Sequence, residues 1–168
     1  TLANAVLNVR YRALLLADTL FAVAALMRTQ ARQFGPVADD ETAGPRPLIG
    51  RLLGLQSALA DQLQAARDVL LESPRTVRRQ RLAAMLMHAL EMRDHLVACE
   101  LDLDTLRTQP SQRPVLDTLR VELDTLAACI DALADALLLG RTPAAFAGTR
   151  PQPLAIVEEA AADRRFAR

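Results

Sequence analysis

The stretch RRQRLAAMLMHALEMRDHLVACELDLDTL, from Arg78 to Leu106, decides the predicted fold. Apolar residues recur in it at alternating steps of three and four, which places them along one side of a helix. At about 1.5 Å of rise per residue, this helix would be roughly 40 Å long. Further apolar positions beside the seam widen this side, so we expect the helix to contact several neighbours and to organise the fold. The main seam consists of Leu82, Met85, Ala89, Met92, Leu96, Cys99, Leu103 and Leu106.

The same spacing continues on both sides of this stretch. Glycine and proline interrupt it at Gly35-Pro36, Ser73-Pro74 and Gly140, where helices commonly begin or end. We therefore expect helices at about residues 2–34, 48–72, 74–107 and 112–139, with Ser73 and Ser111 as N-caps and Pro114 in a first turn. A short fifth helix is expected at 154–165. The predicted buried positions of the first helix are Val6, Val9, Ala13, Leu16, Leu20, Val23 and Met27. Those of the second are Leu52, Leu55, Leu59, Leu63, Ala66 and Leu70. Those of the fourth are Leu116, Leu119, Leu123, Leu126, Ile130, Leu133 and Leu137.

The connections between these helices predict how they pack. The short junction at Ser73-Pro74 forces its two helices into an antiparallel hairpin. The sequence thus predicts an all-α fold, an antiparallel up-down-up-down four-helix bundle with a short extra C-terminal helix, forming one domain over residues 1–168. In such a bundle the first helix begins and the fourth helix ends at the same end of the molecule.

The composition supports helices and argues against several functional classes. Apolar residues make up 51% of the chain but aromatic residues only 3%, which favours packed helices over sheets. Twenty basic residues balance twenty acidic ones, so no overall charge indicates a nucleic-acid partner. The two cysteines, Cys99 and Cys129, lack the spacing of a metal site and are interpreted as buried, reduced side chains. The most apolar run, Ala13–Met27, is too short for a membrane span and contains Asp18.

The two histidines give the best candidate for a metal site. His88 and Glu91 lie three residues apart, and Glu91 and His95 four apart, with Asp94 between them, so adjacent members share a helix face. However, His88 and His95 are about 10 Å apart along the axis, and no other helix has a histidine. We therefore favour hydrogen bonds from these histidines to neighbouring carboxylates. A carboxylate-metal enzyme using Glu91 and His95 is the less favoured alternative. The sequence predicts no catalytic residues, no enzyme activity and no cofactor.

Charged residues form three further patterns. The repeated pairs Arg67-Asp68 and Arg93-Asp94 could form ion pairs between helices or contact a ligand. A group of arginines at the start of the third helix is interpreted as a solvated end of the bundle, with phosphate or anionic lipid as the alternative. Arg10, Arg12, Arg28 and Arg32 fall off the first seam, and the aspartates of the fourth helix form a solvated stripe. The arginine group is Arg75, Arg78, Arg79 and Arg81, and the aspartates are Asp117, Asp124 and Asp131.

Three segments carry a resemblance to a known family. The segments YRALLLADTLFAVAALMR, LGLQSALADQLQAARDVLL and EMRDHLVACELDLDTL resemble the helical region of bacterial inner-membrane proteins of the fusaric acid resistance and aromatic acid exporter (FUSC) family. The resemblance covers about Arg10–Leu139 and is strongest over Gln64–Leu71 and Glu91–Leu106. Members of this family are similar in having two membrane halves separated by a soluble helical region, and they are associated with efflux of aromatic acids or related compounds.

The resemblance implies a function, to which the residues leave alternatives. It implies that this chain, which starts at Thr1 without methionine, is a fragment of a larger membrane protein. We then expect a soluble domain on the cytoplasmic side of the bacterial inner membrane with a structural, assembly or gating role. Its expected partners are the membrane domain of the parent chain and a second copy. The alternative is a free-standing helical adaptor or a sensor that binds a small aromatic acid through an arginine.

Overall fold

The computed structural model describes residues 2–35, 46–72, 76–98 and 110–143, and these residues are helical, with no strand among them. The helices are α1 (Leu2–Gln33), α2 (Arg46–Leu70), α3 (Val77–Ala98) and α5 (Arg113–Leu139), and a 3-10 turn, η2 (Pro110–Gln112), precedes α5. The predicted all-α fold is thereby confirmed. The predicted fifth helix at 154–165 and the predicted extension of the third helix over 99–107 lie outside the described residues.

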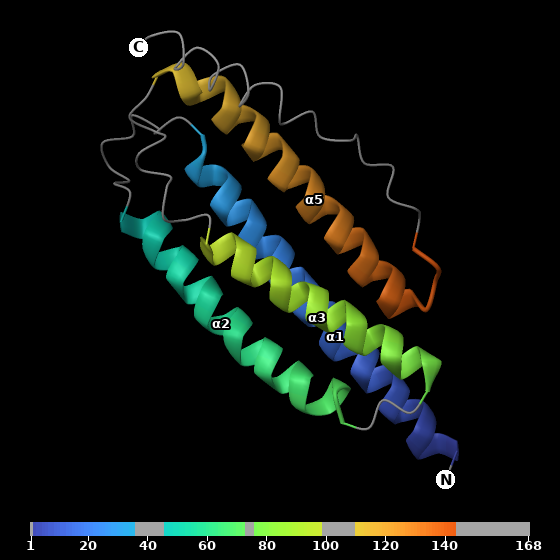
Figure 1. Cartoon of the computed structure of the whole chain (residues 1–168). Coiled ribbons are helices and arrows are strands. Elements are labelled where there is room, and N and C mark those ends of the chain that lie inside the picture. The colour runs from blue at the N-terminus through green and yellow to red at the C-terminus, as the bar shows by residue number, and fades with distance from the viewer. Residues whose placement is uncertain (1, 36–45, 73–75, 99–109, 144–168) are drawn as a thin grey trace, which may run out of the picture.

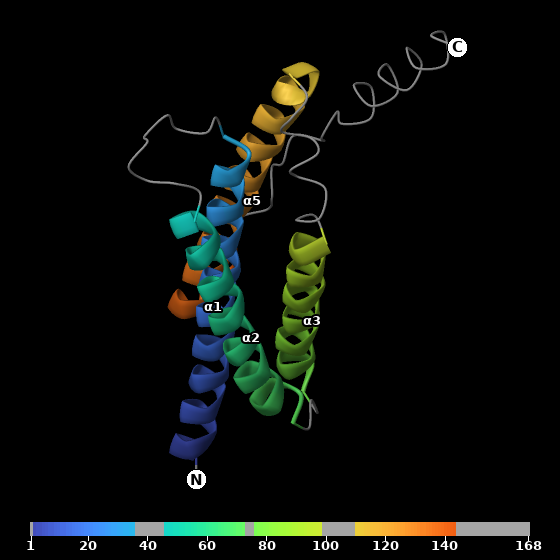
Figure 2. The ribbon, with the colours of Figure 1, turned by 90° about the vertical axis from the view of Figure 1, so that its left-hand side faces the viewer.

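Helix α1 is the centre of the fold. It packs most extensively against α5, next against α2 and then against α3, whereas the described part of α5 packs mainly on α1. Figures 1 and 2 show α1 with α5 along one side and the α2–α3 pair along the other. A regular four-helix bundle would instead give every helix two comparable neighbours. The expectation that the third helix organises the fold is therefore wrong.

The residue pattern of α1 explains why it lies at the centre. From Leu16 to Phe34, buried positions cover more than half of the circumference of the helix, and the exposed residues Asp18 and Arg32 lie on the remaining side. Two threonines in this stretch are also buried, and each hydroxyl donates a hydrogen bond to a backbone carbonyl one turn earlier. The Thr19 hydroxyl reaches the Leu15 oxygen at 2.8 Å, and the Thr29 hydroxyl reaches the Ala25 oxygen at 2.9 Å. These bonds remove most of the cost of burying a hydroxyl group.

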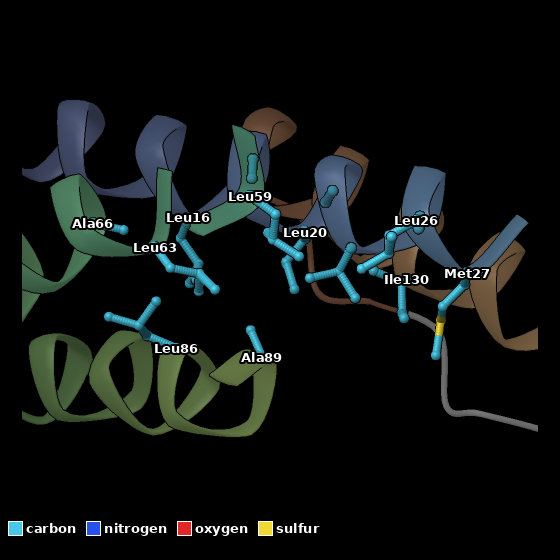
Figure 3. Close-up of a cluster of buried hydrophobic side chains, with 14 of the residues drawn as sticks. Leu16, Leu20, Leu26, Met27, Leu59, Leu63, Ala66, Leu86, Ala89 and Ile130 are labelled. Carbon is cyan, nitrogen blue, oxygen red and sulfur yellow. The ribbon is translucent and has the colours of Figure 1, made fainter. Parts of the chain in front are cut away.

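One continuous core joins the four helices (Figure 3). Leu16 and Leu20 of α1 lie opposite leucines of α2, and Leu86 of α3 approaches from the other side. Further along α1, Leu26 and Met27 meet Ile130 of α5. All six predicted positions of the second helix are buried or half-buried, so that seam is confirmed. The buried members of the core on α2 and α3 are Leu52, Leu59, Leu63, Ala66, Leu70, Leu82, Leu86, Ala89 and Leu96.

The seam predicted for the fourth helix is partly wrong. Leu119 and Leu126 are exposed, while Ala127 and Ala134 are fully buried. Because α5 turns two alanines toward α1, it can approach the central helix more closely than a face of leucines would allow. The core-facing stripe is thus rotated by one position from the leucine pattern.

The directions of the helices determine where the described chain enters and leaves. Helices α1 and α3 run one way, and α2 and α5 run the other (Figure 1). The start of α1, the end of α2 and the start of α3 therefore lie toward one end of the molecule, which we call the α1-start end, whereas α5 runs in that direction but ends beside the middle of α1 (Figure 2). Helix α1 extends beyond the other helices at this end (Figures 1 and 2). Among the described helices, none has the length and apolarity needed to cross a bilayer.

Capping of the helices agrees with only some of the sequence predictions. Gly140 ends α5 in the left-handed conformation, with φ of 64°, and the Arg141 N–H donates to the Ala136 oxygen at 2.8 Å, as in a Schellman motif. At the start of α5, Pro114 occupies the first turn as predicted, but the N-cap is Gln112 and its side chain makes no capping hydrogen bond. The prediction of Ser111 as the cap is therefore wrong.

The start of α3 has a cap that the sequence analysis missed. The Thr76 hydroxyl oxygen accepts a hydrogen bond at 3.3 Å from the backbone N–H of Arg79, which follows Thr76 by three residues, as in an N-cap. The predicted cap, Ser73, lies outside the described residues.

Candidate functional site

The histidines predicted as possible ligands lie on the exposed side of α3. His88 Nδ1 is 3.0 Å from Glu91 Oε2, and both side chains are exposed. His95 and Asp94 are also exposed. The favoured interpretation, a hydrogen bond to a carboxylate, holds for His88, although its partner lies on the same helix. Among the described residues, no three metal-binding side chains come close enough to hold one ion.

The two arginine–aspartate pairs do not link helices, which corrects the prediction of interhelical ion pairs. Asp68 accepts a hydrogen bond from Gln64 Nε2 of its own helix at 3.0 Å, and Arg67 is exposed. Arg93 Nη1 lies 3.3 Å from Oδ1 of Asp94, its neighbour in the chain. Both pairs face solvent, so each contributes little to the stability of the fold.

Two polar side chains of the central helix link it to other helices. The Arg28 guanidinium forms an ion pair with the carboxylate of Asp131 on α5, through a hydrogen bond from Nη2 to Oδ2. The side chains are 39% and 28% exposed, so solvent screens the pair only in part. The pair fixes which turn of α5 lies beside which turn of α1. It also corrects the interpretation of Asp131 as a member of a solvated stripe.

A second polar link joins α1 to the end of α3. Gln30 is buried, and its Nε2 donates a hydrogen bond to the Leu96 backbone oxygen at 2.7 Å. Gln30 therefore ties α1 to α3 from inside the core. Its own Oε1 is buried and has no hydrogen-bond partner among the described residues.

The third polar group is a buried arginine near the α1-start end. Arg12 is only 5% exposed, although the seam pattern places it outside the core. Its Nε lies 3.4 Å from Asn8 Oδ1, one turn earlier, and its Nη1 is buried and has no hydrogen-bond partner among the described residues. A buried guanidinium with an unpaired N–H group is costly, because the group loses water and gains no acceptor. Arg12 is thus buried even though it falls off the predicted seam.

Arg28 holds α1 to α5, and Gln30 holds α1 to α3, near the end opposite the α1-start end. We take these polar contacts of α1 as the candidate functional site.

Sequence reasoning could not have found most of this site. Arg28 and Asp131 are separated by 103 positions, and nothing in either helix alone indicates the pairing. Gln30 lies in the mostly polar stretch RTQARQ (residues 28–33) at the end of α1, where nothing in the sequence separates it from its exposed neighbour Arg32.

Comparison with known protein families gives a match over nearly the whole chain. A family model described as the FUSC-like inner membrane protein yccS matches residues 1–161. No curated protein and no solved structure matches the chain significantly.

Proposed function

Because the chain belongs to the family of FUSC-like inner membrane proteins, we propose that it forms the cytoplasmic helical domain of a FUSC-type inner-membrane transporter. In this proposal the domain has a structural, assembly or gating role in efflux of aromatic acids or related compounds. The family match over nearly the whole chain carries the proposal.

The arrangement of the helices supports a position beside the membrane domain. Helix α5 runs back toward the end at which α1 starts (Figure 1) and ends beside the middle of α1 (Figure 2). A domain placed between two membrane-embedded halves needs its chain to enter and leave on one side. The α1-start end is thus the end that we assign to the membrane.

The central position of α1 supports a gating role. Because α1 contacts each of the other helices, a shift of its exposed start changes the packing of all three at once. The Arg28–Asp131 and Gln30–Leu96 contacts hold the far end of α1 in register. A pull at one end of α1 would therefore move the bundle as a body rather than separate one helix.

The cytoplasmic location can be tested in the full-length parent protein. Ser57 of α2 is exposed, and in a background lacking native cysteines Ser57→Cys offers a single thiol for a membrane-impermeant maleimide. We expect labelling in inverted inner-membrane vesicles and none in intact spheroplasts. Labelling of intact spheroplasts would overturn the cytoplasmic assignment.

The role in transport can be tested with a pair of leucine variants in the same parent protein. Leu16→Ala opens a cavity beside α1, whereas Leu7→Ala alters an exposed side chain of the same helix. We expect efflux to fall for Leu16→Ala at unchanged protein abundance if the role is gating, and abundance to fall if the role is assembly. Equal efflux and abundance for both variants would contradict either role.

One observation favours a second candidate, a sensor of small aromatic acids. The buried and unpaired Nη1 of Arg12 is the kind of donor that a carboxylate would satisfy. A ligand at ten times its Kd would raise stability by about 1.4 kcal/mol, or roughly 3–5 °C in Tm. A thermal-shift panel of benzoate-type acids tests this function, with Arg12→Met as the variant that loses the shift. No shift across the panel would exclude it.

A further inference from the structure

Helix α3 is the least firmly packed of the four helices. It packs less extensively against α1 than α2 or α5 does, and it packs against α2 less still. Two of its five buried residues are alanines, which bury little apolar area and therefore contribute little to stability. The buried residues of α3 are Leu82, Ala83, Leu86, Ala89 and Leu96.

The side of α1 that faces α3 has a buried polar residue toward each end. Arg12 and Gln30 are separated by 18 positions, which is five full helical turns, so they lie on the same side of α1. Gln30 bonds to Leu96 of α3, and Leu16, one turn after Arg12, lies near Leu86 of α3 (Figure 3). The α1–α3 contact is thus bounded by Arg12 at the start of α3 and by Gln30 at its end.

Both of these residues have a buried polar atom without a partner among the described residues. The atoms are Nη1 of Arg12 and Oε1 of Gln30. Each lost water on burial and gained no hydrogen bond in return, so the packed state is less favourable at both places. If α3 moves away from α1, water can reach both atoms. The α1–α3 contact is therefore easier to break than its leucines alone would indicate.

The other polar groups of α1 give no such relief. Thr19 lies between Arg12 and Gln30, and its hydroxyl is already satisfied by the Leu15 oxygen. On the α5 side, Arg28 and Asp131 satisfy each other, so separation of α5 breaks an ion pair. Among the described contacts of α1, the unmet hydrogen bonds thus lie along α3.

We propose that α3 detaches from α1 as a unit while α1 stays packed against α2 and α5. Hydration of Arg12 and Gln30 offsets part of the cost of exposing the apolar side of α3. In the packed state the domain moves as one body, and the detached state is a second, less populated one. The inference goes beyond the proposed function, because it concerns a motion within the domain itself.

A matched pair of buried cysteines tests the proposal in the 168-residue chain. Ala89 of α3 is 1% exposed and Ala127 of α5 is 0% exposed, and both belong to the core around α1. In a background without native cysteines, Ala89→Cys and Ala127→Cys place the same thiol on the two helices. We expect dithionitrobenzoate to react with the Ala89→Cys variant about tenfold faster or more, because local opening frees α3 and not α5.

A second substitution tests the part played by Arg12. Arg12→Met, added to Ala89→Cys, should slow the reaction by about fivefold or more, because detachment then no longer hydrates a buried unpaired N–H group. The matched control is Arg10→Met, which removes the same charge from an exposed position of the same helix. This control should change the rate by less than about twofold.

Two results would overturn the proposal. Equal reaction rates for Ala89→Cys and Ala127→Cys would mean that α3 leaves only when the whole domain unfolds. Equal effects of Arg12→Met and Arg10→Met would mean that opening does not hydrate Arg12. If circular dichroism shows that a cysteine variant is unfolded, amide hydrogen exchange of the unchanged chain replaces it. Faster exchange in α3 than in α1 and α5 then supports detachment, and equal protection overturns it.

Discussion

Truncation of Leu16 probes the central position of α1. Leu16 is fully buried and lies between Leu63 and Ala66 of α2 and Leu86 of α3 (Figure 3). Replacement by alanine removes three carbon atoms, which at about 0.8 kcal/mol per buried methylene lowers the free energy of unfolding by about 2.4 kcal/mol. The cavity left between three helices adds to this, so the total loss should be about 3–5 kcal/mol.

The assay is urea unfolding followed by circular dichroism at 222 nm. The matched control is Leu7→Ala, the same substitution at an exposed position of the same helix, which should change the free energy of unfolding by less than about 0.5 kcal/mol. For a domain of this size the Leu16→Ala loss corresponds to a fall in Tm of roughly 6–15 °C. If Leu16→Ala and Leu7→Ala lose the same free energy, α1 does not lie at the centre of the core.

Three further substitutions test individual contacts. A double-mutant cycle of Arg28→Ala and Asp131→Ala should give a coupling energy of about 0.5–1 kcal/mol, because the pair is partly exposed, and a value of zero would refute the link between α1 and α5. Arg12→Met should leave the free energy of unfolding unchanged or raise it by up to about 2 kcal/mol, since it removes a buried unpaired charge, and a large loss in urea unfolding would mean that Arg12 has a partner. Gly140→Ala should cost about 1 kcal/mol from backbone strain alone, because a Cβ there meets no atom within 4 Å, and a neutral result in the same assay would argue against the left-handed cap.

Much of the fold follows from local sequence patterns. The seam of α2 was predicted correctly because that helix packs on one side only, so its leucines and its buried residues coincide. Helix boundaries were also close where glycine ends a helix, as at Gly140. In these cases the information needed to place a residue is held within a few turns of the chain.

The parts that were not predicted depend on which helices meet. The seam of α5 was misjudged because its leucine stripe is regular, yet packing on the central helix selects Ala127 and Ala134. The third helix was taken as the organiser because its apolar stripe is wide, but Val97 and Met87 remain exposed. Single-helix patterns count apolar residues and do not show how many neighbours each side will have.

The candidate site shows the same limit. The residues chosen from the sequence were conspicuous by type, such as His88 and His95, and the structure places them on the solvent side of α3. The residues that link helices, Arg28 and Gln30, lie in the mostly polar stretch that ends α1. Whether a polar residue in such a stretch faces solvent or a partner is decided by the packing of distant segments.

The distance between spin labels tests the central arrangement most directly. Asp131 pairs with Arg28, so Leu139 should lie level with about residue 20 of α1, roughly 20 Å from Leu7 at 1.5 Å per residue and a helix spacing of about 9 Å. Ser111, in η2 at the start of α5, should lie roughly 60 Å from Leu7 by the same reckoning. In a background without native cysteines, double electron–electron resonance between labels at Leu7 and Leu139 should give the shorter distance, and labels at Leu7 and Ser111 the longer one. The reverse order would mean that α1 begins and α5 ends at opposite ends of the molecule.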